Sequence, residues 1–268
     1  MYPFTYQRAH SLPDSVQGLR NDAEAKLLAG GMTLLPTMKM RLAAPSRLID
    51  ITRLADLRGM TREGNSLVIG AAQRHGEVAA DPTVRDAIPA LADLAGHIGD
   101  PQVRARGTLG GSIANNDPAA DYPAALLGLD ATVITDRRSI AAADFFLGLF
   151  TTALEPDEII RAVRFTLPRR AFYAKFAQAA SGYAMAGVMV AQLDAGIRVA
   201  VTGAGPGVFR WREAEAALER RWSTEAIADC ALDTGALNTD LHGSAAYRAQ
   251  LVRVMAAQAI GRLDGAAR

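Results

Sequence analysis

The sequence contains a single cysteine, Cys230, among its 268 residues. One thiol cannot form a disulfide within the chain, and it cannot supply the cysteine ligands of an iron–sulfur cluster. The four histidines, at positions 10, 75, 97 and 242, form neither an HExxH motif nor another paired spacing of a metal site. We therefore expect no metal ion or cluster held by this chain alone.

An excess of charge of one sign is also missing, because 29 Lys and Arg residues are balanced by 28 Asp and Glu residues. A nucleic-acid-binding surface normally needs a basic excess. No stretch approaches the roughly 18 uninterrupted apolar residues of a membrane-spanning helix. The first residues also lack the basic segment and apolar run of a signal peptide. These absences predict a cytoplasmic protein that binds neither nucleic acid nor membrane.

Three common motifs of enzymes are absent. The chain has no GxxxxGK[ST] phosphate loop and no GxSxG nucleophile motif. The glycines of residues 203–208 depart from the dinucleotide pattern GxGxxG at Val208, and we interpret this segment as a turn after a strand. The sequence therefore provides no candidate catalytic residue.

Strand and helix patterns alternate, which predicts an α+β fold. In the first third, strands are expected at 4–10, 25–31 and 46–52, with helices at 11–22 and 33–44. Residues 57–71 predict a hairpin with its turn at Gly64-Asn65. Helices at 83–99 and 122–130 and strands at 131–136 and 158–168 follow. After Pro168 we expect strands at 171–180, 184–193 and 197–205, then helices at 212–221, 223–236 and 244–264.

Two glycine pairs interrupt apolar stretches. Gly30-Gly31 lies between a predicted strand and a predicted helix, where glycine lets the backbone approach a phosphate group closely. Gly110-Gly111 lies in "GTLGGSIANNDPAAD", where small polar residues follow at once. The alternatives are an ordinary turn at the first pair, and at the second a bulged strand before a helix capped by Asp121. Two such loops about 80 residues apart suit a dinucleotide bound between two lobes.

The two loops and their order resemble the FAD-binding medium subunit of molybdenum hydroxylases, the family of xanthine dehydrogenase and aerobic carbon monoxide dehydrogenase. The resemblance rests on "AGGMTLLPTMKMRLAAPSRLIDI", on "IGDPQVRARGTLGGSIANNDPAADYPAALLGLDATV" and on "YAKFAQAASGYAMAGVMVA". It implies a two-lobed FAD-binding domain of the vanillyl-alcohol-oxidase type over 1–170, with lobes 1–53 and 54–170. A small C-terminal domain, a three-stranded antiparallel sheet with helices, would occupy 171–268.

The resemblance also implies where FAD binds without a covalent link. The first phosphate loop corresponds to Leu28, Ala29, Gly30, Gly31, Met32, Thr33 and Leu34, and the second to Thr108, Leu109, Gly110, Gly111 and Ser112. Asp121 would be a polar ligand at the end of the second loop. Ile98 and Ile160 would flank the adenine, and Lys175 and Tyr183 would lie near the flavin.

At two positions the chain departs from many relatives. Gly182 stands where they carry an acidic residue before the aromatic position, and Gln178 stands where they carry a basic one. This removes charge close to the flavin, which affects its potential or its choice of electron acceptor.

The family's reaction takes place on partner subunits. A large subunit carries the molybdenum-pterin centre and a small subunit carries two [2Fe–2S] clusters, in a dimer of heterotrimers. This chain would accept electrons from the clusters and pass them to NAD, a quinone or oxygen. Two alternatives are a flavin-free scaffold of the same fold and a stand-alone nicotinamide dehydrogenase. The intact glycine loops disfavour the scaffold, and the missing GxGxxG motif disfavours the dehydrogenase.

Overall fold

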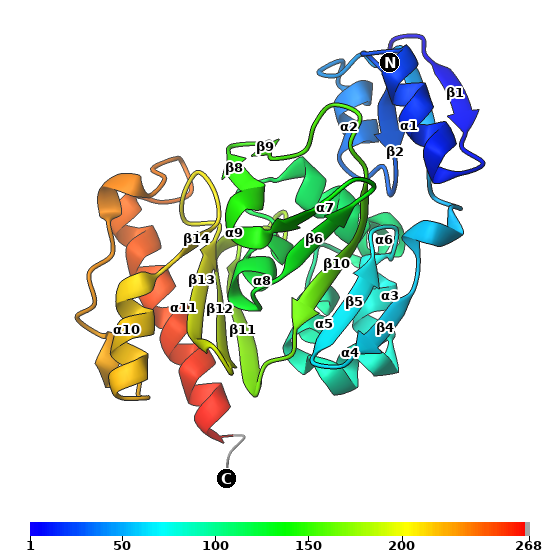
Figure 1. Ribbon diagram of the computed structural model, residues 1–268. Helices are drawn as coiled ribbons and strands as arrows, with labels where there is room; N and C mark the ends of the chain where they lie inside the picture. The colour runs from blue at the N-terminus through cyan, green and yellow to red at the C-terminus, as the bar shows by residue number, and fades with distance from the viewer. Residues whose placement is uncertain (266–268) are drawn as a thin grey trace.

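The computed structural model describes residues 1–265. They form three main sheets with helices packed against them (Figure 1). The first sheet is parallel, in the order β1 (Thr5–Arg8), β3 (Arg47–Asp50), β2 (Lys26–Leu28). Helices α1 (Leu12–Asn21) and α2 (Leu34–Lys39) join its strands. Ser11 accepts the N–H of Asp14 and so caps α1. This order confirms the alternation predicted for the first third of the chain.

Helix α2 ends earlier than the predicted residue 44. Arg41 adopts a left-handed φ of 62°, and the N–H of Leu42 donates to the carbonyl of Thr37 over 2.9 Å. This bond terminates the helix in the way that a left-handed residue commonly does. Thr33, the residue before α2, makes no capping hydrogen bond with its side chain.

The second sheet has antiparallel strands in the order β4 (Met60–Glu63), β5 (Ser66–Gly70), β10 (Ile160–Thr166), β6 (Thr132–Thr135), β7 (Ser139–Ala141). The predicted hairpin is confirmed as β4–β5, and Gly64 takes a φ of 57° in its turn. The helices of this region are α3 (His75–Ala80), α4 (Pro82–Ala87), α5 (Pro89–Gly96), α6 (Pro101–Arg106), α7 (Leu109–Asn115), α8 (Tyr122–Gly128) and α9 (Ala142–Phe145). A two-stranded sheet, β8 (Phe146–Gly148) with β9 (Thr151–Thr152), follows α9.

Two predictions for this region are wrong. The helix expected over 83–99 is divided into α4 and α5, because Pro89 has no N–H and Ile88 leaves the helical conformation at φ −143° and ψ 78°. The bulged strand offered as an alternative around Gly110 is also absent, since these residues begin α7. Thr108 caps that helix by accepting the N–H of Gly111 at 3.1 Å.

The third sheet is antiparallel, in the order β11 (Arg170–Ala177), β12 (Ala184–Leu193), β13 (Gly196–Thr202), β14 (Phe209–Arg210). The short β14 adds a fourth strand to the three that were predicted. Helices α10 (Arg212–Arg220) and α11 (Ala245–Gly265) are close to their predicted ranges. Within residues 1–265, no helix combines the length and the apolar character needed to cross a membrane.

The prediction of a helix over 223–236 is wrong. Only two short 3-10 turns form there, η2 (Glu225–Ile227) and η3 (Thr234–Ala236). Ala231 lies between the two turns, and its carbonyl accepts the indole N–H of Trp211 over 2.7 Å. This carbonyl is therefore used in a tertiary hydrogen bond and not in a helix.

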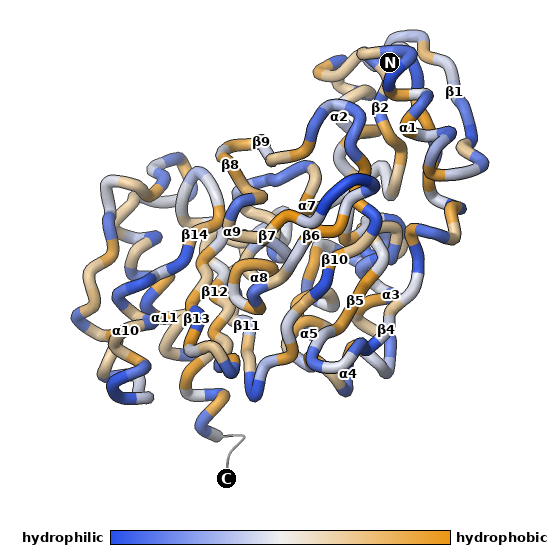
Figure 2. The backbone as a smooth tube through the Cα atoms, in the orientation of Figure 1, coloured by the Kyte–Doolittle hydropathy of each residue, from blue (hydrophilic) through white to orange (hydrophobic). Residues whose placement is uncertain are grey.

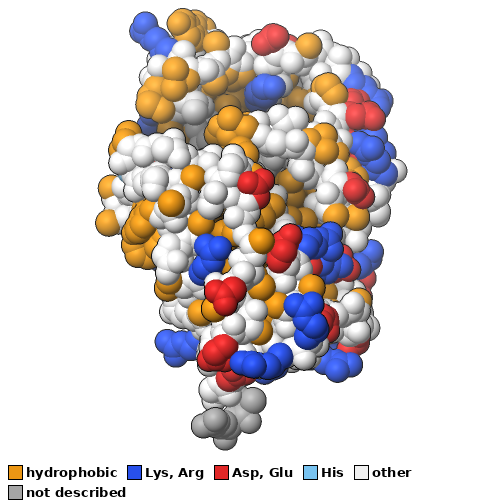
Figure 3. All heavy atoms as spheres, turned by 90° about the vertical axis from the view of Figure 1, so that its left-hand side faces the viewer, with side chains coloured by type: hydrophobic (Ala, Val, Ile, Leu, Met, Phe, Trp, Pro, Cys, Tyr) orange, Lys and Arg blue, Asp and Glu red, His pale blue; other side chains and the backbone are white. Residues whose placement is uncertain are grey.

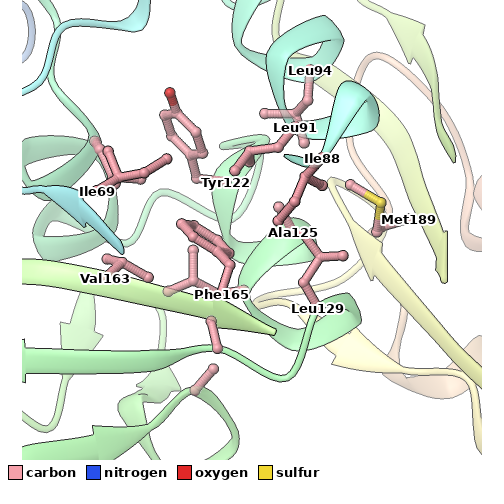
Figure 4. Close-up of a cluster of buried hydrophobic side chains, with 14 of the residues drawn as sticks. Ile69, Ile88, Leu91, Leu94, Tyr122, Ala125, Leu129, Val163, Phe165 and Met189 are labelled. Atoms are coloured by element: carbon pink, nitrogen blue, oxygen red, sulfur yellow. The ribbon is translucent and has the colours of Figure 1, made fainter. Parts of the chain in front are cut away.

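The second and third sheets share one hydrophobic core. Helix α8 packs on β12 and β13, and α5 packs on β11. Met189 of β12 is buried near Ala125 of α8, Ile88 just before α5 and Leu129 just after α8 (Figure 4). Strand β12 is hydrophobic along most of its length (Figure 2). The third sheet is therefore packed against the second rather than tethered to it.

One ion pair, Arg20 with Asp157, joins the first lobe to the second beside the cleft described below. Arg20 of α1 and Arg137 each contact the carboxylate of Asp157 at 2.6 Å. The neighbouring Glu158 has a fully buried side chain, which accepts two hydrogen bonds from Arg138, at 2.9 and 2.8 Å, and one from Thr135. Elsewhere charged side chains of both signs are interspersed, as the lower part of the face in Figure 3 shows.

We predict that Glu158→Gln lowers the free energy of unfolding by about 1–3 kcal/mol at pH 7, because a charge-assisted bidentate contact is lost. The hydrogen bonds from Arg138 lower the pKa of Glu158 from 4.5 to about 2. The carboxylate therefore stabilises the fold above pH 4.5, and this contribution is lost as the pH falls towards 2. Urea denaturation at pH 7 and pH 3 measures both effects.

The matched control is Glu155→Gln, since Glu155 is more than half exposed and pairs with Arg137. It is expected to change stability by less than about 1 kcal/mol. Equal effects of the two substitutions at pH 7 would contradict the role given to Glu158.

Candidate cofactor site

A cleft of about 520 Å³ lies between the first and second lobes and reaches the third sheet. Its size is typical of a small-molecule or cofactor site. It brings together all the predicted site residues except Leu109 and Lys175, and its members are Leu28, Ala29, Gly30, Gly31, Met32, Thr33, Leu34, Ile98, Thr108, Gly110, Gly111, Ser112, Asp121, Ile160 and Tyr183. Leu109 is instead fully buried in the core of the second lobe.

The first glycine loop lines the cleft and has a run of backbone N–H groups without internal acceptors. Strand β2 ends at Leu28, and Gly31 takes a left-handed φ of 71° before α2 begins. The N–H groups from Ala29 to Thr33 donate no hydrogen bond to any residue that the structure describes. Five consecutive donors without an internal acceptor suit an anion with several oxygens.

The second loop differs from this expectation, because its N–H groups are already used. Those of Leu109 and Gly110 donate to the carbonyls of Gln73 and Ala71, at 3.0 and 2.8 Å. The N–H of Gly111 donates to Thr108, as described above. This loop therefore offers the cleft a flat glycine surface. The side chains of Ser112 and Asn115 also line the cleft.

The two loops touch through glycine. A β-carbon built on Gly30 would lie 2.7 Å from the Cα of Gly107 and closer still to the carbonyl oxygen of Arg106. One built on Gly110 would lie 2.6 Å from the β-carbon of Ala71. Neither position has room for a side chain, since real β-carbons do not approach so closely. The first loop therefore directly contacts the residues just before the second loop, whereas the contact of Gly110 lies within the second lobe.

A buried carboxylate closes the end of the cleft next to the third sheet. Asp121 is 4% exposed and accepts the hydroxyl of Tyr173 at 2.6 Å and the ammonium of Lys175 at 3.0 Å. Burial raises the pKa of the Asp121 carboxyl, while Lys175 and Tyr173 oppose that rise. Lys175 does not line the cleft itself, but its ammonium contacts Asp121, which does. Asp121 is the residue before α8, but its side chain does not cap that helix.

Tyr183 stands on the wall between this cleft and a second cavity of about 480 Å³. Its side chain is 46% exposed. Gln178 orders the preceding loop, because its side-chain oxygen accepts the N–H groups of Ala180 and Ser181. Gly182 takes a φ of 73° there, with its β-position 3.6 Å from the Cα of Gly99. Here Gln178 shapes the loop, and Gly182 lets it approach the second lobe.

Sequence reasoning missed two buried polar residues of the cleft wall, His75 and Glu158. A lone histidine and a lone glutamate carry no motif, so no pattern in the sequence identifies them. Asn116, considered as a polar group of the second loop, has a structural role. Its amide donates to the carbonyls of Gly148 and Thr151, both at 2.8 Å. Among the described residues no group of His, Cys, Asp and Glu side chains is arranged to hold a metal ion.

Comparison with known proteins identifies the family of the chain. Residues 2–169 match the family model described as the FAD binding domain in molybdopterin dehydrogenase. The carbon monoxide dehydrogenase medium chain of Hydrogenophaga pseudoflava is 36% identical over 96% of each chain. The nicotine 6-hydroxylase medium subunit of Paenarthrobacter nicotinovorans is also 36% identical, over 92% of this chain and 93% of its own.

Solved structures show the same fold. The carbon monoxide dehydrogenase of Hydrogenophaga pseudoflava that lacks the Mo-pyranopterin moiety matches with a TM-score of 0.88 and 36% identity over 97% of each chain. Quinoline 2-oxidoreductase from Pseudomonas putida 86 matches with a TM-score of 0.89 and 28% identity, over 98% of this chain and 97% of its own. The chain belongs to the family of FAD-binding medium subunits of molybdenum hydroxylases and is an oxidoreductase subunit.

Proposed function

We propose that this chain is the electron-transfer subunit of a heteromeric molybdenum hydroxylase and holds non-covalent FAD along the cleft. The observation that carries the proposal is the run of N–H groups from Ala29 to Thr33, which have no acceptor among the described residues. These donors would bind the pyrophosphate of FAD, because a phosphate oxygen satisfies backbone N–H groups without a side-chain cation. The match to an FAD-binding family gives independent support.

The remaining walls would orient the rest of the cofactor. The flat surface at Gly111 faces Ala29, with its β-position 3.8 Å from the β-carbon of Ala29, so a slender chain fits beside it. Ser112 offers a hydroxyl to the ribityl or ribose groups. Ile98 and Ile160 would contact the adenine, as the family resemblance implies, and both line the cleft.

The flavin ring would lie towards the third sheet, beside Tyr183 and Asp121. FAD bound there would supply the redox centre that takes electrons one at a time and passes them on in pairs. Tyr183 would cover the ring and exclude water. Lys175 would act through Asp121, since its ammonium is held 3.0 Å from that carboxylate. The buried ion pair would thus fix the charge at the flavin end of the cleft.

An external acceptor would approach through the second cavity. This cavity shares Asp117, Ser181 and Tyr183 with the cleft, so a molecule there would be separated from the flavin mainly by Tyr183. NAD, a quinone and oxygen are the candidate acceptors. Exposure of nearly half of the Tyr183 side chain agrees with a residue that regulates access.

Electrons would come from partner subunits. The relatives carry the names medium chain and medium subunit, which denote one component of a larger assembly. We propose a [2Fe–2S] small subunit and a molybdopterin large subunit as partners, in a dimer of heterotrimers. The hydroxylation itself would take place on the large subunit.

A flavin-free scaffold of the same fold is the second candidate. It would bind partners without a redox role, and the unpaired donors from Ala29 to Thr33 would then serve no ligand. A purified protein without flavin absorbance, even after incubation with FAD, would favour the scaffold. The stand-alone nicotinamide dehydrogenase has no support from the comparisons.

We predict that denaturation of the purified chain releases FAD and neither FMN nor a flavin bound to peptide. A pyrophosphate is needed to engage the N–H groups of the first loop, and FMN carries a single phosphate. Chromatography of the acid supernatant identifies the flavin. Recovery of FMN alone, or flavin that stays with the precipitate, would contradict the non-covalent dinucleotide site.

Gly111→Val is expected to fold but to weaken FAD binding by at least about 100-fold, or roughly 3 kcal/mol. The new β-carbon would lie 3.8 Å from that of Ala29 on the cleft wall, so the side chain would narrow the path proposed for the cofactor. It would also lie 2.9 Å from Oγ1 of Thr108, which must shift slightly. The matched control is Gly261→Val in α11, where a β-carbon meets no atom within 4 Å. Titration of the flavin-stripped proteins with FAD measures both affinities. Unchanged FAD affinity in Gly111→Val would show that this glycine is only part of a turn.

Tyr183→Ala is expected to retain FAD but to change its visible spectrum and to accelerate its reoxidation by oxygen, since the ring would lose its cover. Tyr247→Ala is the control, because Tyr247 has similar exposure, 43%, and lies outside the cleft. Stopped-flow absorbance compares the reduced proteins at one oxygen concentration. Identical spectra and rates in wild type and Tyr183→Ala would place Tyr183 away from the flavin.

A further inference from the structure

His75 lies beneath the second glycine loop. It is the first residue of α3 and is 4% exposed. Its N–H donates to the carbonyl of Gly107 over 2.9 Å, and the preceding Arg74 forms an antiparallel bridge with Thr108. The start of α3 therefore follows the backbone that leads into the loop.

The His75 ring packs directly against the backbone of a glycine, Gly107. A β-carbon built on Gly107 would lie 2.5 Å from Nε2 of His75 and 2.8 Å from its Cδ2. Gly107 in turn lies against Gly30, as described above. His75, Gly107 and Gly30 thus pack in sequence from the core of the second lobe to the phosphate loop of the first. Displacement of the imidazole would remove the support of both loops.

The geometry of the imidazole favours its neutral form. Nδ1 is buried and has no hydrogen-bond partner among the described residues. The ring of Tyr122 lies 5.4 Å away at an interplanar angle of 50°, and its hydroxyl likewise lacks a partner. A protonated ring would carry a buried N–H without an acceptor, together with an uncompensated charge.

Among the described residues no carboxylate forms an ion pair or a hydrogen bond with the His75 ring, and the only charge that shifts its pKa is that of Arg104. The ionisable residues of the helices packed on α3, and of α8 beside the ring, are Arg85, Asp86, Asp93, Arg104, Arg106 and Tyr122. On α3 itself the carboxylate of Glu77 accepts the N–H of Arg74 and pairs with Arg58. Burial, followed by the positive charge of Arg104, lowers the pKa of His75 from 6.5 to about 4.

We propose that His75 is a positioning residue for FAD: its neutral ring holds the two glycine loops together, and its protonation opens them and releases the cofactor. This inference rests on the proposed FAD site. In the opened form the ring meets water and regains an ordinary pKa. Between pH 6.5 and 4 a proton therefore binds the opened form and not the closed one. Acidification then favours opening by about tenfold per pH unit.

The test follows the rate of FAD release after a pH jump. The FAD-loaded chain is mixed into buffers between pH 7.5 and 5, and the rise of flavin fluorescence gives the dissociation rate. We expect the wild-type rate to increase about tenfold per pH unit below pH 6.5. His75→Gln keeps a neutral side chain of similar length, so its rate is expected to stay nearly constant from pH 6.5 to 5. His10→Gln is the control, because His10 is exposed, and it is expected to retain the wild-type slope.

A second readout uses the wild-type protein alone. The four histidines give separate ring signals in an NMR titration, and the signal lost in His75→Gln assigns His75. We expect it to titrate well below pH 6.5 in the FAD-loaded chain. If His75→Gln folds but no longer retains FAD at pH 7.5, its release rate cannot be measured. The titration of the His75 ring in the wild type then tests the inference.

The same slope in wild type and His75→Gln, or a His75 ring that titrates near pH 6.5 with FAD bound, would overturn this inference. These outcomes are distinct from failure of the proposed function. In that case the wild-type chain would bind no FAD at pH 7.5, where His75 is neutral.

Discussion

The cleft depends on the contact between Gly30 and the turn formed by Arg106 and Gly107. These residues are more than 70 positions apart, and they approach so closely that no β-carbon fits between them. The contact sets the distance between the two lobes at the point where the first loop presents its N–H groups. A methyl group at Gly30 would separate the lobes and displace those groups together. The geometry of this end of the cleft therefore depends on two positions that lack side chains, Gly30 and Gly107.

The other end of the cleft depends on the shared core. Met189 and its neighbours join the third sheet to α5 and α8, so Tyr173 and Lys175 are held against Asp121. This buried group connects β11 with the start of α8. The third sheet therefore contributes to the cleft wall, which the loop with Tyr183 also lines. The first lobe contributes the N–H groups without acceptors at one end of the cleft. The third sheet and the second lobe together form the opposite end of the cleft, at Asp121.

Much of this arrangement could be predicted from the sequence, because local patterns determine it. The alternating strands of the first lobe, the Gly64 turn and the loop at Gly30-Gly31 follow from residue type and spacing, whereas Gly110 and Gly111 lie in the first turn of α7 and not in a loop. The failed helix predictions have two causes. Pro89 interrupts the helix expected over 83–99. At residues 223–236 a tertiary contact competes with the helix, because the indole N–H of Trp211 donates to the carbonyl of Ala231. The different roles of the loops could not be predicted, since the acceptors of Leu109 and Gly110 come from distant residues. No sequence motif surrounds His75, and its role is inferred only from the packing of Gly107 against its ring.

The central claim is that the N–H groups from Ala29 to Thr33 bind the pyrophosphate of FAD. A ¹H–¹⁵N NMR titration of the labelled, flavin-free chain tests it directly, with riboflavin as the ligand that lacks phosphate. The account predicts that FAD shifts the amide signals of these five residues downfield and that riboflavin leaves them in place. Signals that FAD does not move, or that riboflavin moves equally, would contradict it.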